Sequence, residues 1–491
     1  MTSSKPIEHH QAIIIGSGFG GMCAAIRLQG EGIHDFLILE RRDFMGGTWC
    51  QNRYPGAAVD VQSALYSLSF EPYDWKQLFA DGEELQTYTR HIIEKHQLEK
   101  HTTTGCNVKR IQWNETAQQW HIETESERDY SAQFVINASG PLSTPVMPKF
   151  AGEERFKGRR FHTNGWPTDY DHKDQKVAVI GSGASAAQVI PAIAPEVKSL
   201  HVFQRTPHWV IPRPDYVFKP WQRRLLKNRW AYRALRQFIY WLLESRVLGF
   251  KYSKTILNVV AKRRATKLIN KQIDDPALRK KVTPDYTIGC KRIILSDTLY
   301  TAYCRNNVEL HDINDGIKEI TETGVITQSG KAIELDALVY STGYDATDGV
   351  ISYPVIGKSG TALSDVWDPF PRAYLGTSIP GFPNLFIVTG PNTGIGHTSA
   401  LVIIEAQMNY IMRSIREVRQ RQQSAIEVQP GAEQKYTDLI HREMERTVWK
   451  SGGCNSWYQS KSGHVIAMFP GFSFTYRRWA KKFRADDHQF S

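Results

Sequence analysis

Two strand–turn–helix units with the same glycine pattern constrain the fold of this chain most. The first covers residues 12–28, AIIIGSGFGGMCAAIRL, and the second covers residues 177–192, VAVIGSGASAAQVIPA. In each, an apolar run meets a glycine turn and then helix-forming residues, which is typical of the opening of a dinucleotide-binding βαβ unit. Each unit is matched by a later apolar run that ends in small residues, FVINASG (134–140) and LVYSTGY (338–344). The sequence therefore predicts an α/β fold with two Rossmann-like dinucleotide-binding domains.

The first unit carries the G-x-G-x-x-G spacing in Gly16, Gly18 and Gly21. These glycines allow a tight turn, a close approach of the backbone to a pyrophosphate, and packing of helix on strand. Glu40 ends the next apolar run, FLILE, 24 residues after Gly16. A carboxylate at this spacing accepts hydrogen bonds from a ribose diol, so this unit is expected to bind a nucleotide with a free adenosine ribose.

The second unit has Gly181 and Gly183, with alanine in place of the third glycine, and its next strand ends at Arg205. Arg205 follows Gly181 by the same 24 residues, but its charge is opposite to that of Glu40. A guanidinium binds a 2′-phosphate in a bidentate manner, so this unit is expected to bind NADPH. Thr206, Ser185 and Gln188 are expected to contact the same nucleotide, and a surface role for Arg205 remains the alternative.

Composition excludes several classes of protein. Hydrophobic residues make up 41% and charged residues 23% of the 491 residues, which is ordinary for a globular chain. No apolar run approaches the ~20 residues of a membrane-spanning helix, and the N-terminus has no apolar export segment. The six cysteines are scattered without a C-x-x-C pair, so they are expected to be free thiols in a cytoplasmic protein. No histidine pattern indicates a metal site.

The basic charge is concentrated in one segment. The chain has a net charge of +11, whereas residues 216–281 alone contain 18 Lys and Arg against 3 acids. This segment is rich in Leu and aromatic residues and is expected to be helical. It could be a solvated helical lid, or it could contact an anionic membrane as a peripheral surface. Nucleic-acid binding is the least favoured, because no recognition motif accompanies the charge.

The patterns divide the chain into five parts. We expect a first part of an FAD-binding domain at 1–150, a first part of an NADPH-binding domain at 151–215, the helical insertion at 216–282, a second part of the NADPH-binding domain at 283–339, and completion of the FAD-binding domain at 340–491. A long helix is expected from Ser399 to Gln422.

Two dinucleotides in one chain suggest hydride transfer from NADPH to a resident flavin. A disulfide reductase would also need a redox-active cysteine pair, which the sequence lacks. Oxygen is therefore the most plausible acceptor of the flavin's electrons.

Three stretches resemble type I flavin-containing Baeyer–Villiger monooxygenases, the family that acts on cyclohexanone, phenylacetone and 4-hydroxyacetophenone. The first is Gly46-Gly47-Thr48-Trp49 followed by Tyr54-Pro55-Gly56 and Asp60. The second contains Phe156, Gly158, His162, Trp166 and Pro167, which match the family fingerprint F-x-G-x-x-x-H-x-x-x-W-[PD] at every fixed position. The third is Lys291-Arg292. The resemblance covers nearly the whole chain, from about residue 10 to about residue 480.

The resemblance implies an enzyme that binds FAD and NADPH and inserts one oxygen of O2 next to the carbonyl of a small lipophilic ketone, through a C4a-peroxyflavin, to give an ester or lactone. It implies that Arg292 supplies a fixed positive charge to the peroxide and that Asp60 orients Arg292. Gly47, Thr48, Trp49, Asp60 and Tyr66 would contact FAD, and Lys291 and Trp457 would contact NADP. His162 would couple domain motion to turnover; a purely structural role is equally open for it.

Other interpretations remain open. A monooxygenase of sulfides or amines, an NADPH–flavin reductase, or a redox sensor could share the same cofactors. Arg292 and Asp60 could merely tie two domains together, and Trp457 could be a core residue. His464 and Phe469 stand where the family has an arginine and a tryptophan, so a relative's substrate preference does not transfer. No obligatory protein partner is indicated.

Overall fold

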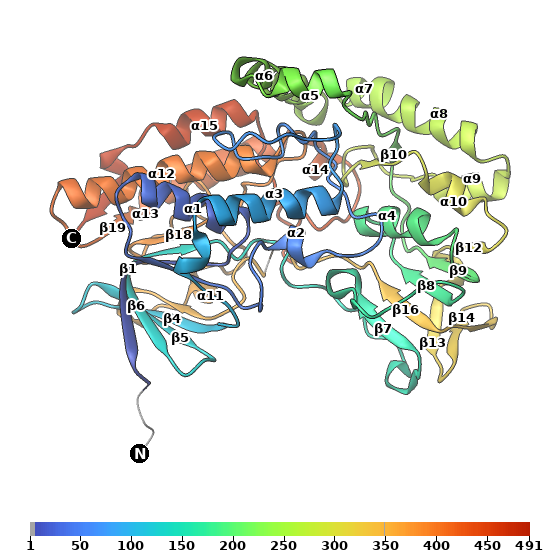
Figure 1. Ribbon diagram of the computed structural model, residues 1–491, viewed down its shortest axis with the longest axis horizontal. Coiled ribbons are helices and arrows are strands. Elements are labelled where there is room, and N and C mark those ends of the chain that lie inside the picture. Colours follow the sequence, from blue (N-terminus) through green and yellow to red (C-terminus); the bar gives the residue numbers. More distant parts are fainter. Residues whose placement is uncertain (1–4, 348) are drawn as a thin grey trace.

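The computed structural model describes residues 5–347 and 349–491 and contains two main sheets, each with helices packed against it (Figure 1). The chain builds most of the first sheet, crosses to the second, and then returns to complete the first. Both predicted βαβ openings are present, and the predicted α/β class is confirmed.

The first sheet has eight strands, with β1 (Ile7–Ile15) near its centre. β1 pairs in parallel with β2 (Phe36–Leu39) on one side and with β6 (Asp129–Asn137) on the other. The residues of β1 that face the core are fully apolar, and α1 (Phe19–Gly30) and α12 (Ala400–Gln420) pack with them. The remaining strands are β3 (Thr102–Thr103), β4 (Val108–Asn114), β5 (Gln119–Thr124), β17 (Val355–Ile356) and β18 (Leu385–Ile387).

The second sheet has five strands and is parallel throughout. Its order is β12 (Val308–His311), β9 (Ser199–Phe203), β8 (Lys176–Ile180), β16 (Ala337–Tyr340) and β7 (Arg159–His162). The helices α4 (Ala184–Ile193) and α10 (Leu299–Tyr303) contribute to its apolar core. A small antiparallel sheet of β13 (Ile317–Ile320), β14 (Gly324–Thr327) and β15 (Ala332–Glu334) lies beside it.

The predicted long helix is confirmed as α12, and the side chain of Ser399 caps its N-terminus by accepting a hydrogen bond from the Leu401 amide. The other elements outside the two main sheets are α2 (Thr48–Gln51), α3 (Gly82–Lys95), β10 (Val210–Ile211), β11 (Ile294–Leu295), α11 (Leu363–Val366), β19 (Ile426–Val428), α13 (Pro430–Met444), α14 (Val448–Ser451), α15 (Ser473–Lys481) and β20 (His488–Phe490). The partition into the five predicted parts stays a prediction.

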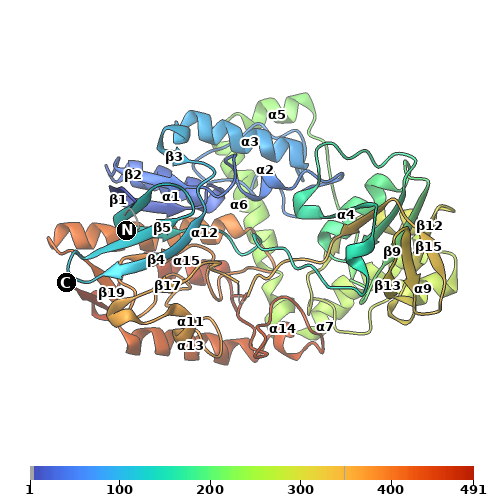
Figure 2. The same ribbon diagram turned by 90° about the horizontal axis from the view of Figure 1, so that it is seen from below.

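The basic insertion is helical, and it spans both sheets (Figures 1 and 2). It comprises α5 (Pro220–Leu226), α6 (Arg229–Glu244), α7 (Lys254–Ile256), α8 (Arg263–Gln272) and α9 (Pro276–Val282), with two π-helical turns around α7. One face of α6 joins the core beside the first sheet, whereas α8 joins the core of the second sheet. The insertion therefore connects the two halves of the molecule. In the described part of the chain, no helix is long and apolar enough to cross a membrane.

One expectation about the cysteines is wrong. Cys290 and Cys454 form a disulfide, with their Cα atoms 6.2 Å apart, although 164 residues separate them in the sequence. Spacing along the chain cannot reveal such a pair, because tertiary packing alone brings the two residues together. Cys23, Cys50, Cys106 and Cys304 are free, as expected.

Candidate functional site

The glycine turn of the first unit forms one wall of a cavity of about 220 Å³. The turn leaves β1, and the loop that precedes α2 closes over it. A Cβ atom on Gly47 would come within 2.6 Å of the Cα of Gly18, so this approach of the two loops requires glycine. Most residues predicted to contact FAD line this cavity: Gly16, Gly18, Glu40, Gly47, Thr48, Trp49 and Tyr66. Gly21 packs against the turn instead, which matches the structural role predicted for the third glycine.

The first turn of α1 suits a pyrophosphate. Gly18 is its N-cap, no side chain caps the free amides, and the turn contains no acid. Unpaired amides and the positive end of the helix dipole together favour a phosphate at this position. The donor groups thus fit a dinucleotide such as FAD.

Glu40 is buried where β2 ends. Its Oε2 accepts hydrogen bonds from the amide and hydroxyl of Ser17, at 3.0 and 2.7 Å, and its Oε1 accepts one from the Arg42 amide at 3.0 Å. A carboxylate has about four acceptor positions, so one remains for a ribose hydroxyl. Glu40 therefore also holds the glycine turn in place, a role that the sequence did not indicate.

Trp49 and Tyr66 form a polar contact on the same cavity wall. The Trp49 Nε1 donates to the Tyr66 hydroxyl at 3.0 Å. Burial raises the pKa of Tyr66 to about 12, although the bond from Trp49 opposes the shift. The Tyr66 hydroxyl therefore stays protonated and can donate to an acceptor in the cavity.

The second unit repeats this arrangement at the start of α4. Gly183 is the N-cap, again without a capping side chain or an acid in the first turn. Arg205 and Thr206 follow β9, and Arg205 is exposed. Lys291 lies close enough that the Arg205 charge and burial together lower its pKa, with burial the larger cause. Two cations held near each other form a site suited to an anion such as a 2′-phosphate.

The α4 helix also contacts the Tyr54-Pro55-Gly56 loop. The Tyr54 hydroxyl donates to the side chain of Gln188 at 2.9 Å, and Gln188 donates to the Ala58 carbonyl at 2.8 Å. A Cβ on Gly56 would come within 2.5 Å of the Gln188 carbonyl oxygen. Gln188, predicted to contact NADP, thus connects the second unit to the loop that leads to Asp60. Gly181, Gly183, Ser185, Gln188, Arg205 and Thr206 line neither the cavity at the first glycine turn nor the larger one that adjoins it.

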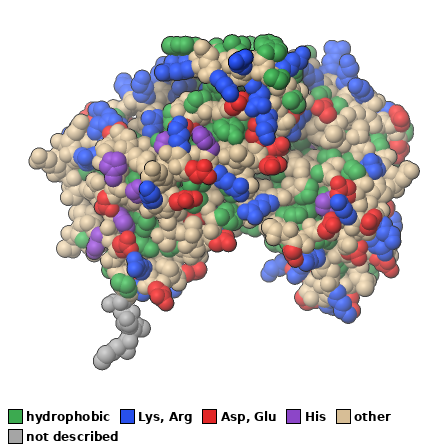
Figure 3. Space-filling view, viewed as in Figure 1, with side chains coloured by type: hydrophobic (Ala, Val, Ile, Leu, Met, Phe, Trp, Pro, Cys, Tyr) green, Lys and Arg blue, Asp and Glu red, His purple; other side chains and the backbone are tan. Residues whose placement is uncertain are grey.

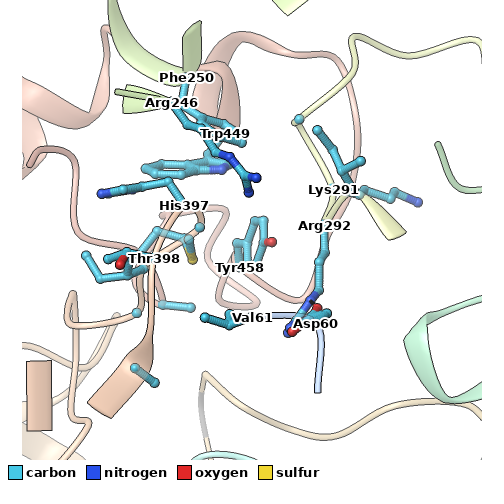
Figure 4. A pocket seen from close by; sticks show the side chains of 18 of the residues that line it. Asp60, Val61, Arg246, Phe250, Lys291, Arg292, His397, Thr398, Trp449 and Tyr458 are labelled. Carbon is cyan, nitrogen blue, oxygen red and sulfur yellow. Dashed lines mark hydrogen bonds and ion pairs between the residues drawn. The ribbon is translucent and has the colours of Figure 1, made fainter. Parts of the chain in front are cut away.

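A larger cavity of about 580 Å³ lies between the insertion and the loops of the first sheet (Figure 4). Asp60, Lys291, Arg292 and Trp457 line it. The sequence assigned Asp60 and Arg292 to catalysis and Lys291 and Trp457 to NADP, and the cavity brings all four together. Pro141, Leu142, Thr389 and Ala400 line both cavities, so the two adjoin. The larger cavity thus brings together residues that stand up to about 400 positions apart in the sequence.

Arg292 forms an ion pair with Asp60 on the cavity wall (Figure 4). Its Nε donates to Oδ2 of Asp60 at 2.7 Å, and its Nη2 contacts the same oxygen. The charge of Asp60 raises the pKa of the guanidinium above its ordinary value, although burial opposes the shift. The Arg292 side chain remains 42% exposed, so its other N–H groups are available to a ligand in the cavity.

The rest of the cavity wall is mainly apolar and aromatic. Tyr458 lies between Asp60 and Trp449 in the close-up view (Figure 4). Arg246 extends from the insertion toward the centre of the cavity (Figure 4). Arg264 also lines the wall. Asp60 is the single acid in this lining, and neither Arg246 nor Arg264 forms an ion pair in the described part of the chain. Tyr458 belongs to the Ser456-Trp457-Tyr458 stretch that resembles the family, although the sequence assigned it no role. The sequence did not single out Arg246 or Arg264, since only the tertiary fold brings them here.

A buried polar cluster anchors the insertion beside this cavity. Glu244 at the end of α6 contacts His397 Nε2 at 3.1 Å, and its oxygens accept from the Ser473 amide at 3.1 and 3.2 Å. The Glu244 and His397 side chains are almost fully buried. This cluster fixes the cavity-facing end of α6 to the part of the molecule that is built around the first sheet.

The fingerprint residues form the edge of the second sheet and a turn beyond it. His162 ends β7, and its Nδ1 accepts a hydrogen bond from the Asn164 amide at 3.0 Å. The carbonyl of Asn164 accepts in turn from Gln51 in α2, at 2.5 Å. The ring of Trp166 packs edge-to-face against that of Phe161, and Phe156 packs beside Gly158. The fingerprint, with Pro167 at its end, thus connects the second sheet to the first cavity through hydrogen bonds.

Comparisons with known proteins agree with this geometry. Residues 13–273 match the sequence profile of the family described as pyridine nucleotide-disulphide oxidoreductase. A Baeyer–Villiger monooxygenase of Pseudomonas aeruginosa is 40% identical over 99% of this chain and 92% of its own length. A closed crystal structure of cyclohexanone monooxygenase is 28% identical, covers 99% of both chains and has a TM-score of 0.87. OTEMO in complex with FAD and NADP is 26% identical, covers both chains fully and has a TM-score of 0.88. The chain therefore belongs to the Baeyer–Villiger monooxygenase family.

Proposed function

We propose that this protein uses NADPH, FAD and O2 to convert a ketone into an ester or lactone. One oxygen atom of O2 enters the product, the other leaves as water, and NADPH supplies the two electrons. The observation that carries the proposal is the Arg292–Asp60 pair, which faces an apolar cavity adjoining the glycine-lined cavity. A fixed cation there stabilises negative charge that develops on oxygen.

The cofactor assignments follow from the donor groups. FAD would lie against Gly16, Gly18, Glu40, Gly47, Thr48, Trp49 and Tyr66, with Asp60 at its reactive end. The nicotinamide nucleotide would lie over Gly181, Gly183 and Ser185, with its 2′-phosphate against Arg205, Thr206 and Lys291 and with Trp457 near its nicotinamide. Bound FAD supplies the hydride acceptor and the chemistry with oxygen.

The chain's own residues then hold charge and exclude water. Asp60 accepts from Nε and Nη2 of Arg292, which leaves Nη1 for the reacting oxygen. Tyr458, Trp449 and the apolar wall lower the local polarity, which strengthens this interaction. His162 and Asn164 act as positioning residues that couple movement of the second sheet to α2.

Within this proposal, residues 1–150 and 340–491 form the FAD domain, residues 151–215 and 283–339 form the NADPH domain, and residues 216–282 form the insertion. The substrate would be a small lipophilic ketone, because the cavity wall is mainly apolar. The protein would act in the cytoplasm.

A ketone that also carries an anionic group is a second candidate for the substrate. Arg246 points into the cavity and has no acid partner among the described residues (Figure 4). A guanidinium without an ion-pair partner in such a cavity favours a carboxylate. Comparing kcat/KM for a neutral ketone and a keto acid of equal chain length, in the wild type and in Arg246→Met, separates the two. A keto-acid preference that Arg246→Met abolishes, with KM for NADPH unchanged, supports the second candidate.

The proposed function is tested by reducing the purified flavoprotein anaerobically with NADPH and mixing it with oxygen and a panel of ketones. Ester or lactone formed in proportion to NADPH consumed supports the proposal. Hydrogen peroxide in equal amount to NADPH, with every ketone unchanged, indicates a reductase or oxidase. Oxygenation of sulfides or amines alone indicates the alternative monooxygenase.

A further inference from the structure

The outer surface of the insertion exposes large apolar side chains that nothing in the structure covers. Six of them lie on α5 and α6 and are at least 50% exposed; we call them the α5–α6 patch: Trp221, Leu225, Trp230, Phe238, Trp241 and Leu242. Phe474 of α15 extends this patch, with its ring 5.9 Å from that of Trp241. Soluble monomers rarely expose large aromatic side chains in such a group, so the patch indicates a binding surface.

The α6 helix has two apolar faces, which explains why one remains exposed. Tyr232, Ile239 and Leu243 point inward and are buried in the core beside the first sheet. Trp230, Phe238 and Trp241 lie on the opposite side of the same helix, at helical spacing. A helix that packs against the rest of the protein on just one side needs one apolar face. The second apolar face is therefore in excess of what the fold requires.

Basic side chains surround the patch. Arg224, Arg229 and Arg233 lie on the same two helices, and none of them forms an ion pair in the described ranges. Figure 3 shows apolar and basic side chains interleaved along the top of the molecule, where Figure 1 places α5 and α6. Between residues 216 and 273 the single acid is Glu244, which is buried. This surface is thus complementary to a negatively charged partner.

The larger cavity reaches the same side of the molecule. Leu248, Ile256 and Val260 line the cavity, and each is also 45–49% exposed. They follow α6 in the chain, and Figure 1 places α7 along the same edge as α5 and α6. An apolar path therefore connects the cavity to the surface next to the patch.

We propose that the α5–α6 patch docks this protein on the surface of an anionic phospholipid membrane, with the cavity opening toward the lipid. Tryptophan and phenylalanine side chains enter the boundary between headgroups and acyl chains, and arginines beside them bind lipid phosphates. The contact is peripheral, since no described helix could span the bilayer. A membrane fits better than a protein partner because the basic and aromatic side chains alternate along outward-facing helices instead of lining a groove.

The proposal concerns binding and needs no turnover, so its test is independent of the proposed function. Purified full-length protein is mixed with vesicles of phosphatidylcholine alone, or with one quarter phosphatidylglycerol, and vesicle-bound protein is measured by flotation. We expect binding to the anionic vesicles at low salt and at least a tenfold loss of binding in 0.5 M NaCl. The absence of binding to anionic vesicles at low salt would overturn the proposal.

Two groups of variants locate the contact. Trp230→Ser, Phe238→Ser and Trp241→Ser combined should lower the vesicle partition coefficient by about 10-fold or more. Arg224→Glu, Arg229→Glu and Arg233→Glu combined should lower it by about 100-fold, since each cation near an anionic surface contributes roughly a fivefold factor. Ile313→Ser, which changes an exposed apolar side chain of the other half, is the matched control and should not alter binding.

Flavin content and the circular dichroism spectrum confirm that each variant folds. Binding that the patch variants leave unchanged would overturn the proposal. A second outcome would also overturn it. If sedimentation velocity shows that the wild type is a dimer and the triple serine variant a monomer, and neither binds vesicles, the patch joins two copies of this chain.

Discussion

Arg292 and Asp60 stand 232 residues apart in the sequence, and Nε of Arg292 donates to Oδ2 of Asp60 at 2.7 Å on the wall of the larger cavity. Asp60 follows the Tyr-Pro-Gly loop that packs on α4, and Arg292 follows the insertion. The pair therefore forms only when both loops are in place, which couples assembly of the cavity to the packing of both halves of the molecule.

Arg292→Ala should keep the reduction of flavin by NADPH and lose ester formation. The substitution removes the cation at the cavity but leaves the glycine turns and Arg205 intact. We expect ester formation to fall by at least about 100-fold, with hydrogen peroxide formed in its place. Product analysis by gas chromatography and a peroxide assay measure both. Arg292→Lys keeps the charge without the planar donors and should recover only part of the activity. Wild-type ester yield in Arg292→Ala would contradict the assigned role.

Arg205→Ala should raise KM for NADPH by about 10- to 100-fold, because a charge-assisted contact to the 2′-phosphate is lost. NADH lacks this phosphate, so KM for NADH should change little. Steady-state kinetics with both cofactors provides the measurement, and Arg305→Ala, an exposed arginine of the same half, is the control. An equal loss with NADPH and NADH would show that Arg205 does not contact the phosphate.

Whether the sequence predicts a contact depends on how far apart in the chain its two residues lie. Gly16, Gly18 and Glu40 lie within one βαβ unit, where local spacing determines geometry, and they do line one cavity. Asp60 and Arg292 could be paired only through resemblance to a family. Arg246 and Arg264 reach the cavity through tertiary packing, and no local pattern marks them. The disulfide was missed for the same reason, since Cys290 and Cys454 belong to separate loops.

The Cys290–Cys454 disulfide lies beside Lys291 and Arg292 and connects their loop to the one that carries Trp457. Thiol titration of the denatured, unreduced protein should therefore give four thiols, and titration after reduction should give six. Cys454→Ser should lower the free energy of unfolding by up to about 4–5 kcal/mol, because a long loop is no longer closed in the unfolded chain. Six thiols before reduction would show that the bond does not form in the protein as purified.

Glu244→Ala should destabilise the protein by about 3 kcal/mol, since it leaves His397 and the Ser473 amide buried without their acceptor. The cluster fixes the end of α6 beside the cavity, so KM for the ketone should rise as well. Denaturant unfolding and steady-state kinetics measure the two effects. The comparison is Glu405→Ala. Glu405 of α12 pairs with Arg236, which lies elsewhere on α6, so this substitution should leave KM for the ketone unchanged.

Burial lowers the pKa of His162 to about 4, whereas an unfolded histidine titrates near 6.5. Between these two values the unfolded chain binds a proton that the folded protein excludes. The free energy of unfolding should therefore fall as the pH drops from about 6.5 to about 4, with no further loss from this residue below that window.

His162→Gln should remove this part of the pH dependence. Because the ring is not wholly shielded from solvent, we expect a difference on the order of 1–2 kcal/mol between pH 7 and pH 4.5. The measurement is urea unfolding at several pH values for the wild type and the variant. His201 and His208 also have pKa values lowered to about 4 by burial, so both proteins should lose stability in acid, and the difference between their slopes isolates His162. Nδ1 of His162 cannot accept the Asn164 amide once it is protonated, so proton uptake must open the hydrogen bond that connects the second sheet to α2. Parallel slopes would therefore mean that the pKa of His162 is not lowered in the folded protein.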